Sequence, residues 1–139
     1  MRTNTIGDAA RLAGVGVETI RFYERKGLIK QPPRPRGGGF RQYTDEIVRQ
    51  LCFVRQAQAL GFSLKEIDVL LNLRADPGTD CKAVQIRASD KLVEVENKIA
   101  QLRIIGEALR DVIAACPLSG GLEGCSIIAA METHAADQG

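Results

Sequence analysis

The chain has 139 residues and a formal net charge of +2, enough for one ordinary domain or a small domain with an appended helix. Hydrophobic residues make up 45% of it and aromatic residues only 4%, with no tryptophan, so its core must be largely aliphatic. No apolar run near the N-terminus resembles a signal peptide or a membrane span. We therefore expect a cytoplasmic protein with reduced thiols and no membrane partner.

Charge is unevenly divided along the chain. Residues 1–55 carry 11 Lys or Arg and 5 Asp or Glu, a balance of +6, while the remaining residues carry a balance of −4. A basic N-terminal part favours a polyanionic partner such as DNA, although a solvated basic surface would give the same balance.

Two short helices are predicted near the N-terminus. Residues 5–13 and 17–26 each place apolar side chains at helical spacing, with Thr5 as the N-cap of the first helix and Gly27 as the stop after the second. The glycines of residues 14–16 supply the turn between them, so the pair is a helix-turn-helix candidate.

Residues 28–43 contain three prolines and three consecutive glycines, which excludes a helix. We predict two short extended pieces, Leu28–Lys30 and Phe40–Tyr43, around a long turn, together forming a small β-wing. The wing carries no acidic residue, and its arginines are Arg34, Arg36 and Arg41.

In a helix-turn-helix the second helix enters the major groove. We expect Arg21 to reach base edges and Arg25 and Lys26 to reach phosphates, although each is equally well explained as a solvated surface charge. Tyr23 and Tyr43 would donate hydroxyls to phosphates unless they are ordinary half-buried aromatics. The predicted DNA-contacting residues are Glu18, Thr19, Arg21, Phe22, Tyr23, Arg25, Lys26, Arg34, Arg36, Arg41 and Tyr43.

Three more helices follow. Thr44 is the expected N-cap of a helix that Gly61 stops, and Ser63 with Glu66 forms a capping box for a helix at residues 64–74. From Cys81 to Ala115 there is no proline, and apolar residues recur every three or four positions. This stripe consists of Val84, Ala88, Leu92, Val95, Ile99, Leu102, Ile105, Leu109 and Ile113. The rest of the chain is too small to cover the stripe, which predicts a homodimer.

These elements predict a mainly α fold. Its expected parts are a winged helix-turn-helix DNA-binding domain at 1–74, a hinge turn at 75–80, a long antiparallel coiled-coil dimerisation helix at 81–115, a metal-binding loop and terminal turn at 116–131, and a flexible tail at 132–139.

The cysteine spacing explains why the coiled coil should be antiparallel. At about 1.5 Å per residue, the helix from Cys81 to Cys116 spans roughly 52 Å, so one straight helix cannot bring both thiols to one metal ion. An antiparallel dimer can, and Cys125 can fold back to Cys116 across a glycine-rich loop. We therefore predict two sites per dimer, each with Cys81 from one subunit and Cys116 and Cys125 from the other.

Three thiolates without a further ligand favour a soft metal ion, whereas zinc normally adds a histidine or a fourth cysteine. We interpret His134 as incidental and Cys52 as a small core residue. Taken singly, Cys81 can also be explained as a structural residue at the start of a helix. No base, nucleophile pair or phosphate-binding loop indicates catalysis.

The segments IGDAARLAGVGVETIRFYERKGLI and FRQYTDEIVRQLCFVRQAQALGFSLKEI resemble the helix-turn-helix, the wing end and the following helix pair of the MerR family of transcription regulators. ACPLSGGLEGCSII resembles the metal-binding loop of the mercury-responsive members, and Cys81, Cys116 and Cys125 match their three Hg(II) ligands. The resemblance implies a regulator of a metal resistance operon that is not an enzyme. It would hold RNA polymerase inactive at double-stranded promoter DNA without Hg(II) and activate transcription with it by distorting the DNA.

Alternatives within the family depend on the same cysteines. Copper-type members lack a cysteine at the position of Cys81, zinc-type members add a ligand in the loop, and drug-sensing members append a large domain that has no room here. Lead- and cadmium-type members keep a similar triad, so Pb(II) or Cd(II) is the alternative effector. A thiol redox regulator, in which Cys116 and Cys125 form a disulfide, is a further alternative.

Overall fold

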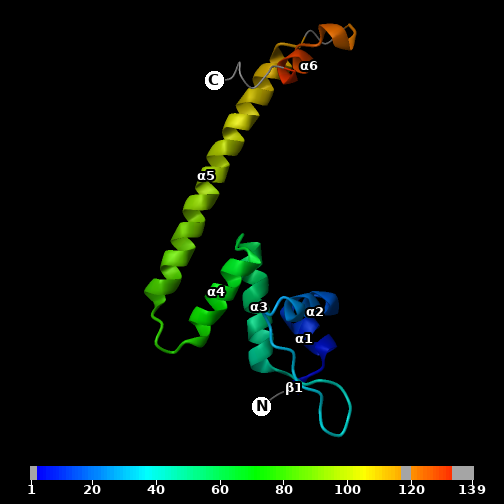
Figure 1. The fold of residues 1–139 in the computed structure, drawn as a ribbon, viewed down its shortest axis with the longest axis vertical. Coiled ribbons are helices and arrows are strands. Elements are labelled where there is room, and N and C mark those ends of the chain that lie inside the picture. The colour runs from blue at the N-terminus through cyan, green and yellow to red at the C-terminus, as the bar shows by residue number, and fades with distance from the viewer. Residues whose placement is uncertain (1–2, 117–119, 133–139) are drawn as a thin grey trace. The chain divides into compact units, whose positions relative to one another are not determined.

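The computed structural model describes residues 3–116 and 120–132 (Figure 1). The chain divides into two compact units, Met1–Lys91 and Leu92–Gly139. The first unit contains β1 (Thr3–Asn4), α1 (Ile6–Ala13), α2 (Val17–Arg25), β2 (Tyr43–Thr44), α3 (Asp45–Ala59) and α4 (Leu64–Ala75). Helix α5 (Cys81–Ala114) begins in the first unit and continues into the second, which also holds the 3-10 helix η1 (Leu122–Gly124) and α6 (Ser126–Met131). The predicted mainly helical fold, a helix-turn-helix followed by a long helix, is confirmed. The predicted boundaries between the DNA-binding domain, hinge, dimerisation helix, loop and tail, after residues 74, 80, 115 and 131, stay a prediction.

Local signals in the sequence set the ends of the helix-turn-helix. Thr5 Oγ1 accepts the Asp8 N–H at 3.2 Å, and the Asp8 carboxylate accepts the Thr5 N–H at 3.2 Å, so a capping box starts α1. Gly14 ends α1 with a φ of 71°, a left-handed conformation that glycine adopts without strain. Gly16 is then the N-cap of α2.

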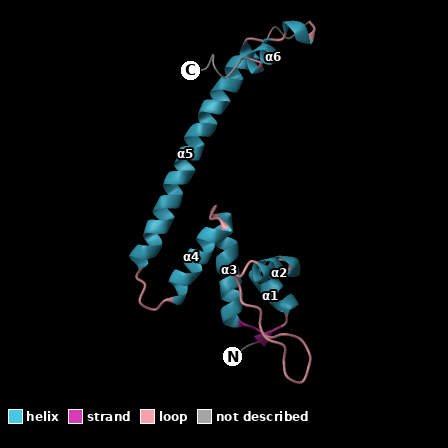
Figure 2. Ribbon diagram, in the orientation of Figure 1, coloured by secondary structure: helices cyan, strands magenta, loops and turns pink. Residues whose placement is uncertain are grey.

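Of the two extended pieces predicted for the wing, only the end of the second, at Tyr43, lies in a strand. Leu28–Lys30 is not a strand, because Leu28 and Ile29 turn their side chains into the core instead. The short strand β2 pairs in antiparallel fashion with β1 at the N-terminus, with Asn4 opposite Tyr43 (Figure 2). Prolines at 32, 33 and 35 have no N–H to donate, so the segment after Ile29 cannot build the ladder that a hairpin needs. Residues 30–42 form an open loop, turned by a hydrogen bond from the Gly38 N–H to the Pro35 carbonyl at 3.1 Å.

Helix α3 contacts both α1 and α4 and organises the core of the first unit. Thr44 Oγ1 accepts the Ile47 N–H at 3.2 Å at the start of α3, and the predicted Ser63–Glu66 capping box starts α4. The buried core is largely aliphatic and consists of Ala9, Ala10, Ala13, Ile20, Tyr23, Leu28, Ile29, Tyr43, Leu51, Val54, Ala57, Ile67 and Leu70.

Helix α5 is a single element of 34 residues, and it ends one residue before the predicted end at residue 115. The large side chains of its apolar stripe are 37–66% exposed in the single chain, and they are Val84, Leu92, Val95, Ile99, Leu102, Ile105, Leu109 and Ile113. Burying apolar surface of this extent away from water is energetically favourable. The stripe is therefore an exposed apolar surface of the kind through which a helix associates with a partner.

The described C-terminal residues form two short elements. η1 and α6 contact each other, and α6 lies at the end of the segment 116–131, where a terminal turn is expected. Part of the predicted loop (117–119), the tail from residue 133 and His134 lie outside the described residues. Within the part of the chain that is described, no helix is both long and apolar enough to cross a membrane.

Candidate nucleic-acid interface and metal-binding cysteines

The second helix of the helix-turn-helix presents charged side chains to solvent. Arg21, Arg25 and Lys26 are exposed, and so is Glu18, whereas Thr19 is only half-exposed. Lys26 Nζ lies 5.7 Å from the centre of the Phe22 ring, which packs in part against the core. The face of α2 that carries Arg21 and Arg25 is therefore free, in the single chain, to meet a polyanion.

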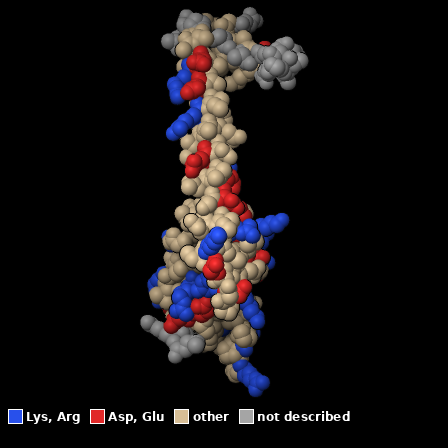
Figure 3. Space-filling view, turned by 90° about the vertical axis from the view of Figure 1, so that its left-hand side faces the viewer, with Lys and Arg blue, Asp and Glu red and all other residues tan. Residues whose placement is uncertain are grey.

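The loop after α2 adds arginines to this face. Arg21 of α2 lines a hollow of about 450 Å³ together with Arg34 and Arg41 of the loop. Arg41 Nη1 donates to the Pro32 carbonyl at 3.1 Å, which braces the two sides of the loop against each other. On the face of the first unit that Figure 3 shows, Lys and Arg side chains are interspersed with Asp and Glu side chains. Arg36 is also exposed, so helix and loop together form one basic surface.

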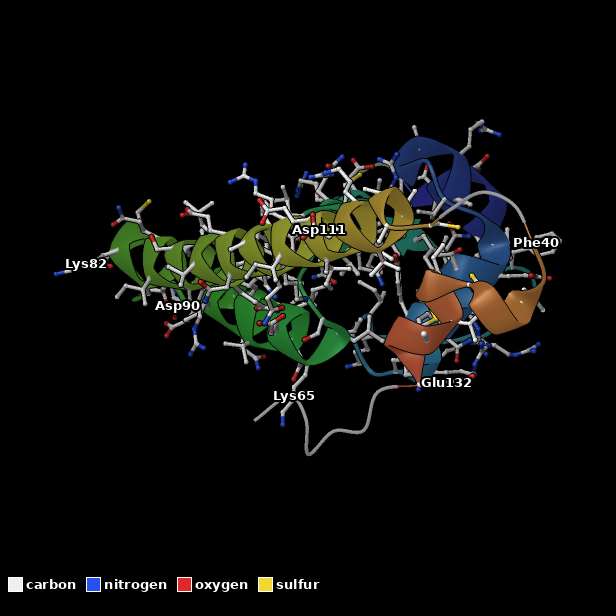
Figure 4. The ribbon with its side chains drawn as sticks, turned by 90° about the horizontal axis from the view of Figure 1, so that it is seen from above. Phe40, Lys65, Lys82, Asp90, Asp111 and Glu132 are labelled. Carbon is white, nitrogen blue, oxygen red and sulfur yellow. The ribbon has the colours of Figure 1, made fainter. Side chains whose placement is uncertain are left out.

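Phe40 lies in the same hollow and was missing from the predicted contacts. Its side chain is 78% exposed on the loop after α2 (Phe40 is labelled in Figure 4). An exposed phenylalanine beside three arginines can pack against sugar or base. The signal in the sequence was its position directly after three glycines, where no apolar periodicity gives it a place in the core.

The two predicted tyrosines occupy the core. Tyr23 is 2% exposed and donates its hydroxyl hydrogen to Gln58 Oε1, and Tyr43 is 1% exposed and donates to Glu24 Oε2 at 2.8 Å. Their hydroxyls are therefore engaged inside the first unit. Of the two explanations considered for these residues, the geometry favours ordinary core aromatics.

Cys81 is the first residue of α5 and its side chain is exposed. Asp80 Oδ1 accepts the N–H groups of Lys82 at 3.0 Å and Ala83 at 3.3 Å, so it acts as the cap of this helix. The cap fixes where α5 begins and thereby places the Cys81 thiol on its first turn.

Cys116 and Cys125 lie beside each other in the second unit. The backbone N–H groups of Ile128 and Ile127, near the start of α6, lower the pKa of the Cys125 thiol. They act as nearby dipoles rather than as a closed cap, because the sulfur makes no capping hydrogen bond. The neighbouring Cys116 thiol lowers the pKa further. Proximity and a stabilised thiolate suit this pair to binding a thiophilic ion.

The remaining cysteine behaves as expected. Cys52 on α3 is half-buried and packs against the core of the first unit. Within residues 3–116 and 120–132, no three His, Cys, Asp or Glu side chains of one chain are arranged to hold a metal ion.

Known proteins resemble this chain over nearly its whole length. Residues 4–73 match the family model described as MerR HTH family regulatory protein, and residues 48–112 match the model described as MerR, DNA binding. The mercuric resistance operon regulatory protein of Shigella flexneri is 44% identical and covers 94% of this chain and 89% of its own length.

Two solved structures are similar in fold. A transcription regulator from Ralstonia metallidurans in complex with lead(II) has a TM-score of 0.80 and 33% identity, over 94% of this chain and 98% of that chain. A MerR regulator from Bacillus megaterium in complex with mercury(II) has a TM-score of 0.71 and 32% identity, over 91% and 97%. Together with the family models, these matches define a DNA-binding helix-turn-helix transcription regulator rather than an enzyme. The chain belongs to the MerR family.

Proposed function

We propose that the chain is an Hg(II)-responsive regulator of a metal resistance operon, which acts as a homodimer on double-stranded promoter DNA. It represses in the absence of metal and activates RNA polymerase in its presence by distorting the DNA. The observation that carries the proposal is the adjacency of Cys116 and Cys125 in the second unit, with Cys81 on the exposed first turn of α5.

The donor set fits a soft ion. Three thiolates bind Hg(II) strongly, and the lowered pKa of Cys125 increases the thiolate fraction available for binding. We assign Cys116 and Cys125 to one subunit and Cys81 to the other, in an antiparallel pair of α5 helices. The exposed apolar stripe of α5 would supply the dimer contact.

Such a site links metal binding to the geometry of the dimer. A metal ion that takes ligands from both subunits binds one arrangement of the two helices better than another, and that difference in affinity shifts the equilibrium. The arginine-bearing surface on α2 and its following loop would carry the shift to the DNA. Metal-binding free energy thus offsets the free energy of DNA deformation.

Mixed dimers test the shared site. Cys81→Ala and Cys116→Ala proteins should each bind operator DNA but fail to bind Hg(II) at stoichiometric concentration. Mixing them should restore one intact site in each heterodimer, whereas Cys52→Ala should bind metal as the unchanged protein does. If mixing never restores binding, the shared-site proposal is wrong.

Pb(II) is the second candidate effector. It is favoured by the lead(II)-bound relative, whose TM-score of 0.80 exceeds the 0.71 of the mercury(II)-bound one. The 44% identity to a mercuric resistance regulator favours Hg(II) instead. A promoter reporter titrated with Hg(II), Pb(II), Cd(II) and Zn(II) separates them, and a response to Pb(II) or Cd(II) equal to or above that to Hg(II) would overturn the mercury assignment.

A redox regulator is the third candidate, because Cys116 and Cys125 are adjacent. Hydrogen peroxide would take two electrons from the two thiols, giving one disulfide and two water molecules. In that case peroxide would change reporter output without metal, and Cys81→Ala would leave the peroxide response intact. A reporter that responds only to metal excludes this candidate.

A further inference from the structure

Lys91 differs from its neighbours on α5. It is the last residue of the first unit and its side chain is buried, with 8% of the residue exposed, whereas Asp90 and Leu92 are exposed. A buried ammonium group needs a partner, because an unpaired charge away from water is strongly disfavoured. The burial therefore indicates a specific attachment at this point of the helix.

The attachment is to the start of α4. Lys91 Nζ donates to Glu66 Oε1 at 2.9 Å and lies 5.4 Å from the centre of the Phe62 ring. The same Glu66 oxygen accepts the Ser63 N–H at 2.7 Å in the capping box of α4. The Ser63 N–H and then Lys91 lower the pKa of Glu66 to about 2. One carboxylate oxygen therefore closes the cap of α4 and binds α5.

The surroundings of the pair are not tightly packed. A hollow of about 250 Å³ lies beside it, lined by apolar Phe62, Val69 and Leu70 and by charged residues that include Lys65 and Asp90 (both labelled in Figure 4). The contacts that attach Lys91 here are its ion pair with Glu66 and its position over the Phe62 ring.

A packed route leads from this pair to the helix-turn-helix. α4 contacts α3, and α3 contacts α1. Coupling between distant sites is carried by such rigid elements when one of them has two arrangements. Lys91 stands where α5 leaves the first unit, at the end of this route.

We propose that Lys91 is a positioning residue that couples α5 to the DNA-binding unit, through its ion pair with the capping carboxylate of Glu66. The inference rests on the proposed metal response, since it concerns how a change in α5 reaches the DNA. When α5 moves, the first turn of α4 moves with it, because the buried ammonium keeps its partner. Loss of the ion pair uncouples the two helices while leaving the cysteines and the arginine surface in place.

The test uses variants that separate the ion pair from the cap. Glu66→Gln removes the charge but keeps a capping-box side chain, and Lys91→Met keeps the apolar stem over Phe62. Each variant of the whole chain should lower the ratio of Hg(II)-induced to metal-free reporter output by at least about fivefold. The double variant should be no worse than either single variant, because both remove the same interaction.

Controls separate coupling from folding and from metal binding. Lys98→Met removes an exposed pair with Glu94 on the same helix and should behave as the unchanged protein. Lys91→Arg keeps the cation and should retain most of the induction. Hg(II) stoichiometry and metal-free operator affinity should be unchanged in Glu66→Gln, a half-exposed residue whose replacement leaves the core intact.

The outcomes distinguish the inference from the proposed function. If the unchanged protein fails to respond to any thiophilic metal, the proposed function is wrong. Lys91 is then judged by amide hydrogen exchange of Ser63 and Glu66, which should be faster in Lys91→Met than in Lys98→Met. If the unchanged protein responds and both Glu66→Gln and Lys91→Met respond equally well, the coupling role is wrong. The coupling role is also wrong if amide exchange in Lys91→Met changes only within α5 and not at Ser63 and Glu66.

Discussion

Tyr43 donates its hydroxyl hydrogen to Glu24 Oε2 at 2.8 Å, and so joins strand β2 to the last turn of α2. The hydrogen bond closes the arginine-bearing loop, because the two residues stand at its two ends. Burial, and then the hydrogen bond to Glu24, raise the pKa of Tyr43 to about 12. The loop is thus held at its base by a buried phenol rather than by a hairpin ladder.

Tyr43→Phe should lower the free energy of unfolding by about 1 kcal/mol at neutral pH, since it removes one buried hydrogen bond. A pKa raised in the folded state stabilises below the unfolded pKa of 10.0, and that contribution is lost as pH rises through about 12. The stability difference between the two proteins should therefore be constant below pH 10.0 and shrink between 10.0 and about 12. Denaturant unfolding across this range measures it, and equal stability at neutral pH would show that the hydrogen bond contributes nothing.

Gly14→Ala should destabilise the helix-turn-helix by about 1–2 kcal/mol, because the Cβ of an L residue crowds the backbone in the left-handed conformation. The φ of 71° sets the cost, since a Cβ there would meet Arg55 Cζ at an ordinary 3.6 Å. Gly7→Ala in α1 is the matched control and should stabilise by about 0.5–1 kcal/mol, as expected inside a helix. Thermal unfolding compares them, and a stabilising Gly14→Ala would contradict the assigned turn.

Elements with local signals could be predicted from the sequence. Thr5, Thr44 and Ser63 cap their helices as expected, because an N-cap depends only on the three residues that follow it. The long α5 followed from apolar periodicity and from the absence of proline.

Features that depend on distant residues could not be predicted. Nothing near Tyr43 indicates that its strand pairs with Asn4, which lies 39 residues earlier. The sequence leaves Tyr23 and Tyr43 open between a DNA contact and the core, because a phenol suits both a phosphate and a core, and only packing decides between them. Lys91 lies outside the apolar stripe, so the pattern gave no reason to bury it.

Glu46 links the start of α3 to the end of α4. We expect it to stabilise the fold at neutral pH and to lose this effect in acid. Arg74, at 2.6 Å, and then Arg49 lower the pKa of the Glu46 carboxyl from 4.5 to about 2. A lowered pKa stabilises above the unfolded value and is lost as pH falls to about 2. Glu46→Gln should therefore be less stable than the unchanged protein at neutral pH, with the difference vanishing near pH 2. Asp45→Asn is a control without such a pair, and a difference independent of pH would contradict the ion-pair explanation.

The arginine surface should divide into two kinds of DNA contact. Arg34→Ala should lower the slope of log affinity against log salt by about 1, because a phosphate contact releases about one counterion. Arg41→Ala should do the same and also loosen the loop, since Arg41 holds the Pro32 carbonyl. Arg21→Ala should instead reduce discrimination between the operator and a base-substituted operator, by about 1–3 kcal/mol.

Fluorescence anisotropy over a range of salt concentrations measures all three variants. Arg103→Ala, exposed on α5 in the second unit, serves as the control and should match the unchanged protein in slope and discrimination. An Arg34→Ala slope equal to that of the unchanged protein would remove the loop from the interface. An Arg21→Ala protein that loses affinity equally for every sequence would reassign Arg21 from a base contact to a phosphate contact.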